Sequence, residues 1–195
     1  MTMTRDEVLD TLRSTGAVSE GHFILPSGLR SPTLIDRSRL FMYPCHLQRL
    51  CQELERKLRV SSVEPFDHIV SISRANMVLG YELARQLDLI STWMEKDGGQ
   101  TKLIGSDLTR GARLLVVEDV VNTGASSREA IHALESLGMK AVGVCCLIDR
   151  SAGDANLDLP LVSLIDLTVP AYPADRIPAQ LQAIPAISIG NPVSG

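Results

Sequence analysis

The sequence predicts an α/β protein in which helices cover a doubly wound, mostly parallel sheet. Two observations favour this fold class. Between residues 68 and 148, short apolar runs alternate with segments of helical periodicity, and strands separated by helices form parallel sheets. The run at residues 114–117 is apolar at every position, which is typical of a strand buried on both faces of such a sheet.

The first elements are predicted from local signals. Thr4 and Glu7 have the spacing of a capping box, so a helix should begin here and stop near Gly16. Residues 22–40 break into short extended pieces, with interruptions at 26–28 and at 31–33, and predict a hairpin-like subregion apart from the main sheet. Pro44 should open a second helix, whose leucines recur on one face.

The alternating elements follow. We expect strands at residues 68–73, 90–94, 114–117 and 141–148, and helices at residues 78–87 and 126–137. Residues 95–110 are polar, contain glycines and lack apolar periodicity, so they predict a long loop, either a functional lid or disordered. Beyond Ser151 the chain is rich in proline apart from an apolar run at 161–167, which predicts a final strand and an extended, wrapping tail.

Length and composition indicate one domain and a small ligand. A chain of 195 residues that is 45% hydrophobic suits a single domain, here residues 1–195, with the hairpin subregion at about 17–43 and the core at about 62–170. The formal charge of -4 comes without a basic stripe, which argues against nucleic acid as a partner. We therefore expect small-molecule substrates.

The cysteines and the apolar runs bear on the cellular setting. The four cysteines lack metal-ligand spacing, and the neighbours Cys145 and Cys146 should point to opposite faces of a strand as core residues. We expect a reduced, cytoplasmic setting. The N-terminus lacks an apolar signal core, and no apolar run reaches the roughly 18 to 20 residues of a membrane span, so no membrane partner is expected.

The most informative motif follows the apolar run at 114–117. Glu118 and Asp119 should lie at the carboxyl end of that strand, where open α/β sheets bind ligands, and two carboxylates can accept hydrogen bonds from a vicinal diol. Small or hydroxylated residues then lead into a helix whose first N–H groups can hold a phosphate. These residues are Asn122, Thr123, Gly124, Ala125 and Ser126. The motif predicts a phosphorylated-sugar site; the alternative is an ordinary turn with Ser126 as helix N-cap.

Residues 114–126 as a whole resemble the PRPP-binding motif of type I phosphoribosyltransferases, where PRPP is 5-phosphoribosyl 1-pyrophosphate. Other segments are similar to the orotate phosphoribosyltransferase branch of that family. Residues 21–36 resemble its N-terminal hood, 78–87 the helix after its pyrophosphate loop, and 141–153 its strand ending in Asp-Arg. The similarity spans about residues 5–185 and implies the type I phosphoribosyltransferase fold with a small hood.

The resemblance implies transfer of a phosphoribosyl group from PRPP to a base, with orotate as the expected base and magnesium (Mg²⁺) as the cofactor. It implies that Glu118 and Asp119 hold the ribose hydroxyls, with Asp119 also catalytic, and that residues 122–126 hold the 5-phosphate. Arg150 would hold the carboxylate of the base, unless it is a surface residue at a strand end. No side chain is assigned as a direct metal ligand. The family also implies a homodimer.

The chain departs from the family at two loops. The expected pyrophosphate loop has no glycine at residues 71–77, and we take Ser73, Arg74 and Asn76 as candidates there, with Asn76 tolerating a positive φ. The lid has few basic residues. Lys96 is the candidate catalytic lysine and Lys102 the alternate, although solvent-exposed loop lysines would look the same.

The third departure lies in the hood. Leu34 and Ile35 stand where the family often has aromatic residues, and they are candidate contacts for the base. With Leu40 and Phe41 they are also candidate interface residues, as exposed apolar side chains. Two alternatives follow from the departures. The enzyme could use a different base, or the protein could be a non-catalytic regulator that binds PRPP or a nucleotide.

Overall fold

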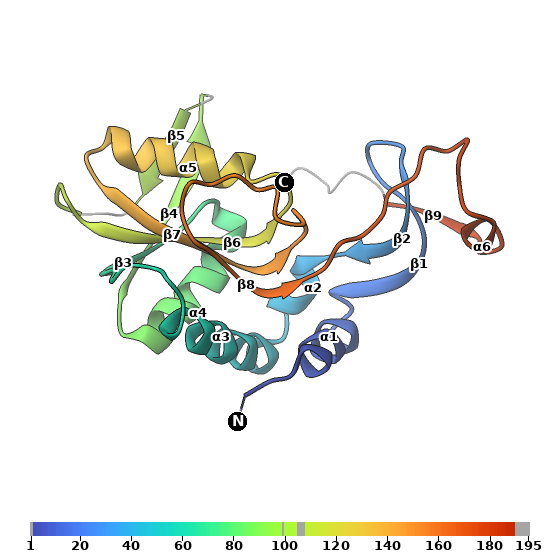
Figure 1. Cartoon of the computed structure of the whole chain (residues 1–195), viewed down its shortest axis with the longest axis horizontal. Coiled ribbons are helices and arrows are strands. Elements are labelled where there is room, and N and C mark those ends of the chain that lie inside the picture. Colours follow the sequence, from blue (N-terminus) through green and yellow to red (C-terminus); the bar gives the residue numbers. More distant parts are fainter. Residues whose placement is uncertain (1, 99, 105–107, 190–195) are drawn as a thin grey trace.

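The computed structural model describes residues 2–98, 100–104 and 108–189, which form two sheets and the helices around them (Figure 1). The strands are β1 Val18–Ile24, β2 Arg30–Ile35, β3 His68–Ser71, β4 Ile90–Asp97, β5 Gln100–Ile104, β6 Arg113–Val121, β7 Lys140–Asp149, β8 Leu161–Asp166 and β9 Ala186–Ser188. The helices are α1 Arg5–Ser14, α2 Arg37–Phe41, α3 Pro44–Arg59, the 3₁₀ turn η1 Arg74–Asn76, α4 Met77–Leu87, α5 Ala125–Ser136 and α6 Ala179–Gln182.

The main sheet has six strands in the order β5-β4-β3-β6-β7-β8, and all neighbours are parallel except β4 and β5. Helices α3 and α4 cover one face and α5 covers the other, so the predicted doubly wound fold is confirmed (Figure 1). Cys145 packs in the core beneath α3 and α4, whereas Cys146 packs in the core beneath α5. These neighbours therefore face opposite sides of β7, as the strand period requires.

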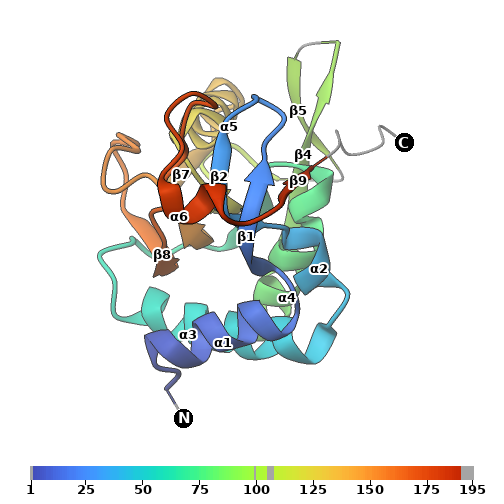
Figure 2. The ribbon, with the colours of Figure 1, turned by 90° about the vertical axis from the view of Figure 1, so that its right-hand side faces the viewer.

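The hood is a second sheet of three strands in the order β2-β1-β9 (Figure 2). The predicted hairpin is present, but residues 31–33 lie within β2 and do not interrupt it. The tail divides between the sheets, because β8 pairs with β7 in the main sheet and β9 pairs with β1 in the hood. Leu40 is 1% exposed and belongs to the core, so the expectation that it forms an exposed interface was wrong.

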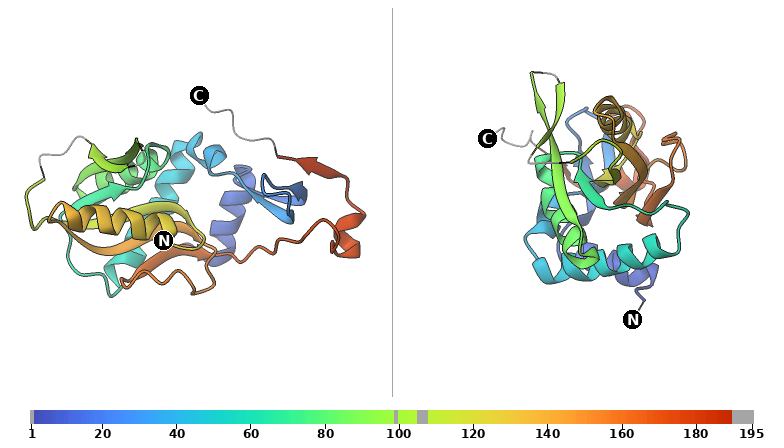
Figure 3. Two further views of the ribbon diagram at one scale, coloured as in Figure 1. Left: turned by 90° about the horizontal axis from the view of Figure 1, so that it is seen from above. Right: turned by 90° about the vertical axis from the view of Figure 1, so that its left-hand side faces the viewer.

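The expected loop at residues 95–110 is largely a β-hairpin. β4 continues to Asp97 and pairs antiparallel with β5, from Trp93 opposite Ile104 to Asp97 opposite Gln100. Figure 3 shows this hairpin standing out from the edge of the main sheet. The prediction missed it because a hairpin with polar residues on both sides lacks the alternation that marks a half-buried strand. Residues 105–107 lie outside the described residues.

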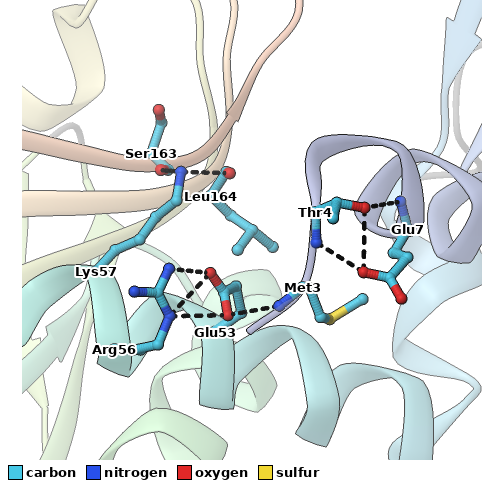
Figure 4. A network of polar contacts seen from close by, with 8 residues as sticks. All are labelled: Met3, Thr4, Glu7, Glu53, Arg56, Lys57, Ser163 and Leu164. Atoms are coloured by element: carbon cyan, nitrogen blue, oxygen red, sulfur yellow. Dashed lines mark hydrogen bonds and ion pairs between the residues drawn. The ribbon is translucent and has the colours of Figure 1, made fainter. Parts of the chain in front are cut away.

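Polar contacts join the N-terminal segment to the core (Figure 4). The Met3 N–H donates to Glu53 Oε2 over 3.0 Å, and Arg56 donates to the same carboxylate. Lys57 Nζ donates to the carbonyls of Ser163 and Leu164 on β8 over 3.0 and 2.8 Å. The predicted capping box of α1 is also present. These bonds fix α1 to α3, and α3 to the outermost strand of the sheet.

Among the described residues, no helix combines the length and the apolar character that a membrane crossing requires.

Candidate active site

A cavity of about 520 Å³ lies at the carboxyl ends of β3 and β6, between η1, the β4–β5 hairpin and α5. It collects side chains from distant parts of the chain. Its polar lining residues are Arg37, Ser73, Arg74, Asn76, Glu95, Lys96, Thr101, Glu118, Asp119, Ser126 and Glu129. This is the edge of a parallel sheet at which α/β proteins bind ligands.

Two carboxylates form the floor of the cavity. Glu118 and Asp119 are only 8% and 4% exposed. The Ser127 hydroxyl donates a hydrogen bond to Glu118. Burial nevertheless raises the pKa of Glu118 to about 7, and the neighbouring Asp119 adds to the rise. Burial also raises the pKa of Asp119, opposed by the charge of Arg37. Both carboxyls can accept hydrogen bonds from sugar hydroxyls when ionised.

Arg37 is a site residue that the sequence did not reveal. Its Nε atom forms an ion pair with Asp119 Oδ2, while the other oxygen of this carboxylate, Oδ1, accepts from the Val120 N–H over 2.7 Å. Arg37 is the first residue of α2, directly after the hood strand β2. Nothing in the local pattern links residue 37 to residue 119, since only the fold brings them together.

The predicted phosphate loop leads into α5 as expected, but the helix begins one residue early. Gly124 is the N-cap, with φ of +72° and no side-chain capping bond, so Ser126 is not the N-cap. Ser126 lines the cavity from the first turn of α5. The first N–H groups of a helix have no intrahelical acceptor, and this terminus can therefore bind a phosphate. Asn122, Thr123 and Ala125 are exposed beside it.

The three candidates for diphosphate binding all line the cavity. Ser73 precedes η1, and Arg74 begins it. Asn76 has φ of -88°, so the expectation that it supplies a positive φ was wrong; the turn after β3 is a 3₁₀ helix that needs none. The Arg74 guanidinium pairs with Glu95 over 2.8 Å, and the Trp93 indole N–H donates to the same carboxylate over 2.8 Å.

The two candidate lysines occupy different places on the hairpin. Lys96 lines the cavity, and its Nζ lies 2.7 Å from Glu129 Oε2 on α5. Thr101 on β5 donates to the other oxygen of Glu129 over 2.6 Å, so Glu129 holds both strands of the hairpin. Lys102 lies on β5, opposite Glu95 of β4, and is not among the residues that line the cavity. The position of Lys96 therefore favours it over Lys102 as the candidate catalytic lysine.

The three candidates for base binding do not line this cavity. Arg150 follows β7, beside the end of β6, and its N–H donates to the Val121 carbonyl over 2.7 Å. Its Nε is buried and has no hydrogen-bond partner among the described residues, and burial lowers its pKa. Leu34 and Ile35 lie in β2, and Ile35 packs against the main core. Their roles in base binding stay predictions.

The donor set bears on the magnesium that the resemblance implies. Four carboxylates line the cavity, but the described residues contain no group of three or more side chains placed to hold a metal ion. Mg²⁺ usually keeps several waters and binds through one or two carboxylates together with substrate phosphates. The carboxylates of the cavity therefore fit a Mg²⁺ ion that is bound mainly by the phosphates of a substrate.

Comparison with known proteins is consistent across the chain. The phosphoribosyl transferase domain family matches residues 46–171. The chain is 44% identical to "Orotate phosphoribosyltransferase 2" of Mesorhizobium japonicum, over 97% of this chain and 98% of that protein. It is 42% identical to "Orotate phosphoribosyltransferase" of Brucella ovis, with the same coverage.

Solved structures agree with the fold. The orotate phosphoribosyltransferase of Aeropyrum pernix is similar with a TM-score of 0.71 and 26% identity, covering 82% of this chain and 93% of that chain. The orotate phosphoribosyltransferase of Mycobacterium tuberculosis H37Rv, at 24% identity and a TM-score of 0.70, shares the fold over 84% of this chain and 96% of its own.

Proposed function

We propose that this chain, which belongs to the phosphoribosyltransferase family, transfers the 5-phosphoribosyl group of PRPP to orotate and releases pyrophosphate. The product is orotidine 5'-monophosphate. The observation that carries the proposal is the placement of Glu118 and Asp119 on the floor of a cavity whose wall includes the first turn of α5. A ribose phosphate offers the matching groups, a vicinal diol and a phosphate.

The sugar is held at two points in this proposal. Its hydroxyls donate to Glu118 and Asp119, and its 5-phosphate accepts from the N–H groups of residues 122–126 at the N-terminus of α5. Two anchors on one rigid strand–helix unit fix the position of the sugar carbon that reacts. Holding reactants in this way removes much of the entropic barrier to their reaction.

The reaction breaks the bond between the anomeric carbon and the diphosphate oxygen, and forms a bond from that carbon to a ring nitrogen of the base. The diphosphate departs with the electron pair of the broken bond, and the base nitrogen gives up its proton to the departing diphosphate or to water. Ser73, Arg74 and Asn76 line the cavity where they can donate hydrogen bonds to the departing diphosphate, and Lys96 adds a positive charge. Asp119 faces the positive charge that develops on the ribose. Lys102 is the second candidate on the hairpin.

Magnesium is part of the proposal as an ion bound to the diphosphate, where it would neutralise charge on the leaving group. Glu118 and Asp119 are the buried carboxylates that line the cavity, and they are the candidates to hold the ion, directly or through water. The protein positions the substrates and excludes water from them. The β4–β5 hairpin borders the cavity and can exclude the water.

Base selection is assigned to Arg150 and the hood. The guanidinium of Arg150 suits a planar carboxylate, which orotate carries and most nucleobases lack. Its buried Nε, which has no hydrogen-bond partner among the described residues, supports a ligand at that place.

Leu34 offers an apolar surface and no aromatic ring, and this observation favours the second candidate, a phosphoribosyltransferase for another base. The turn at 71–77 departs from the family's diphosphate loop, which has a glycine, and this departure motivates the third candidate, a binding regulator.

We also propose a homodimer in a cytoplasmic setting. Support for the dimer comes from apolar side chains that are exposed near α3 and α4: Tyr43, Val78 and Tyr81 are 44%, 44% and 64% exposed. Sedimentation of the purified protein tests the dimer, and a monomer at all concentrations would contradict it. Support for the setting comes from the cysteines, which are free in the structure.

The test of the reaction is pyrophosphate release from PRPP and Mg²⁺ against a panel of orotate, other pyrimidines and purines, with Asp119→Asn as control. Release with orotate alone, lost in Asp119→Asn, supports the proposed reaction. Release with another base would move the assignment to that base. PRPP binding without release across the whole panel would favour the regulator.

A further inference from the structure

The basic side chains of the cavity are already paired with carboxylates of the same cavity. Arg37, Arg74 and Lys96 are the basic residues among the described lining residues. Arg37 pairs with Asp119, Arg74 with Glu95 over 2.8 Å, and Lys96 with Glu129 over 2.7 Å. A polyanionic substrate therefore meets a cavity whose cations already have carboxylate partners.

The pair of Arg37 and Asp119 differs from the other two, because its carboxylate is the proposed acceptor for the sugar. Asp119 Oδ1 accepts from the Val120 N–H. Asp119 Oδ2 is buried, has no hydrogen-bond partner among the described residues, and is reached only by the ion pair with Arg37. A sugar hydroxyl that binds Oδ2 therefore competes with the guanidinium of Arg37 for this oxygen.

Arg37 is placed so that its side chain can move while its backbone stays fixed. The Asp36 carboxylate caps α2 by accepting from the Ser38 N–H over 3.1 Å, and Leu40 anchors the helix in the core. The Arg37 side chain is 52% exposed, whereas the Asp119 side chain is 5% exposed. The guanidinium therefore lies at the border between solvent and a buried carboxylate, and leaving it requires no change in the fold.

We propose that Arg37 is an exchangeable counter-ion of Asp119: a sugar hydroxyl takes its place at Oδ2, and its guanidinium then pairs with an oxyanion of the bound substrates. The inference rests on the proposed function for the identity of the sugar. In the empty cavity Arg37, through its positive charge, compensates the buried carboxylate. In the filled cavity it supplies a positive charge that the sparse basic residues of the hairpin do not.

The kinetic test compares three variants. Arg37→Gln removes the charge, Arg37→Lys keeps it, and Arg39→Gln is the matched control, because Arg39 lies on the same helix, is exposed, and does not line the cavity. A charge-assisted hydrogen bond predicts that Arg37→Gln raises a substrate KM about tenfold or more while kcat changes less. Arg37→Lys should recover part of that loss, and Arg39→Gln should behave as the native protein.

Binding measurements keep the test independent of turnover. Calorimetric titration with inorganic pyrophosphate, ribose 5-phosphate and orotate shows which ligand Arg37→Gln binds more weakly, and so which oxyanion the guanidinium holds. If the native protein binds these ligands without turnover, the proposed reaction fails while the role of Arg37 is still measured. Equal affinities in Arg37→Gln and Arg39→Gln for all three ligands would overturn the inference. So would tighter binding in Arg37→Gln, since Arg37 would then only compete with the substrate.

Discussion

The Ser127 hydroxyl, on the helix that follows the phosphate loop, donates a hydrogen bond to the Glu118 carboxylate on β6. Ser127 is fully buried, and Glu118 is nearly so. The bond ties the first turn of α5 to the carboxyl end of β6, so the proposed phosphate and ribose anchors are held at a fixed separation. It also lowers the pKa of Glu118 against the larger effect of burial, which raises that pKa to about 7.

Replacing Ser127 by alanine should shift the pH dependence of the reaction. The ionised Glu118 carboxylate accepts hydrogen bonds from hydroxyls more strongly than the protonated acid does, so activity should fall as pH drops below its pKa. Removing a hydrogen bond to the ionised form raises that pKa above about 7. The acid limb of kcat/KM against pH should therefore move to higher pH in Ser127→Ala. Ser136→Ala, on the exposed end of α5, is the control, and coincident acid limbs in both variants would refute the prediction.

Glu118→Gln should stabilise the protein at high pH. Because the pKa of Glu118 is raised from 4.5 to about 7 on folding, the folded state favours the protonated form. The contribution of Glu118 to the free energy of unfolding is most favourable below pH 4.5. It falls as pH rises, and the loss reaches about 3 kcal/mol once pH exceeds 7. The gain in free energy of unfolding in Glu118→Gln should thus grow between pH 5 and pH 8 in denaturant titrations. A gain that does not vary with pH would show that Glu118 is not buried as described.

Gly124→Ala should be more damaging than the same change at another glycine of positive φ. Gly124 has φ of +72°, and a Cβ there would lie 2.5 Å from the Ala155 carbonyl oxygen and 2.8 Å from Leu157 Cδ2. Gly28 has φ of +83° with nothing within 4 Å, so Gly28→Ala isolates the conformational cost. That cost is about 1 kcal/mol. Chemical denaturation should give a clearly larger loss for Gly124→Ala, and equal losses would contradict the close packing of this loop.

Glu129→Gln should loosen the hairpin with little effect on global stability. The Lys96–Glu129 pair is exposed, and exposed pairs contribute about 1 kcal/mol or less. The melting temperature should hardly change, while amide hydrogen exchange in β4 and β5 should become faster, because Glu129 holds both strands. Glu135→Gln, on the same helix and paired with exposed His132, is the control. Unchanged exchange in the hairpin would show that other contacts hold it.

Features encoded in short stretches of sequence could be predicted. The buried run before Glu118 and Asp119 marks its strand by composition alone, and the small residues that follow mark the start of a helix. The capping box at Thr4 is equally local. The placement of Ser73, Arg74 and Asn76 at the cavity follows from the order of strands in a parallel sheet.

Features that depend on contacts between distant parts of the chain could not be predicted from the sequence. Glu129 holds Lys96 only because the hairpin folds back over α5, and a polar hairpin leaves no periodic signal. The pairing of β9 with β1 joins the two ends of the chain, and the tail sequence has no feature that selects β1 over the main sheet. The same holds for Arg37, whose local pattern is that of an exposed basic residue on a short helix.

Direct detection of the product is the measurement that tests the proposed reaction most plainly. The purified protein is incubated with PRPP, Mg²⁺ and orotate, and the mixture is analysed by mass spectrometry, beside Asp119→Asn. We expect orotidine 5'-monophosphate and pyrophosphate in equal amounts from the native protein and neither from the variant. Orotate that stays unconsumed at saturating PRPP, in a sample that binds PRPP, would contradict the proposed reaction.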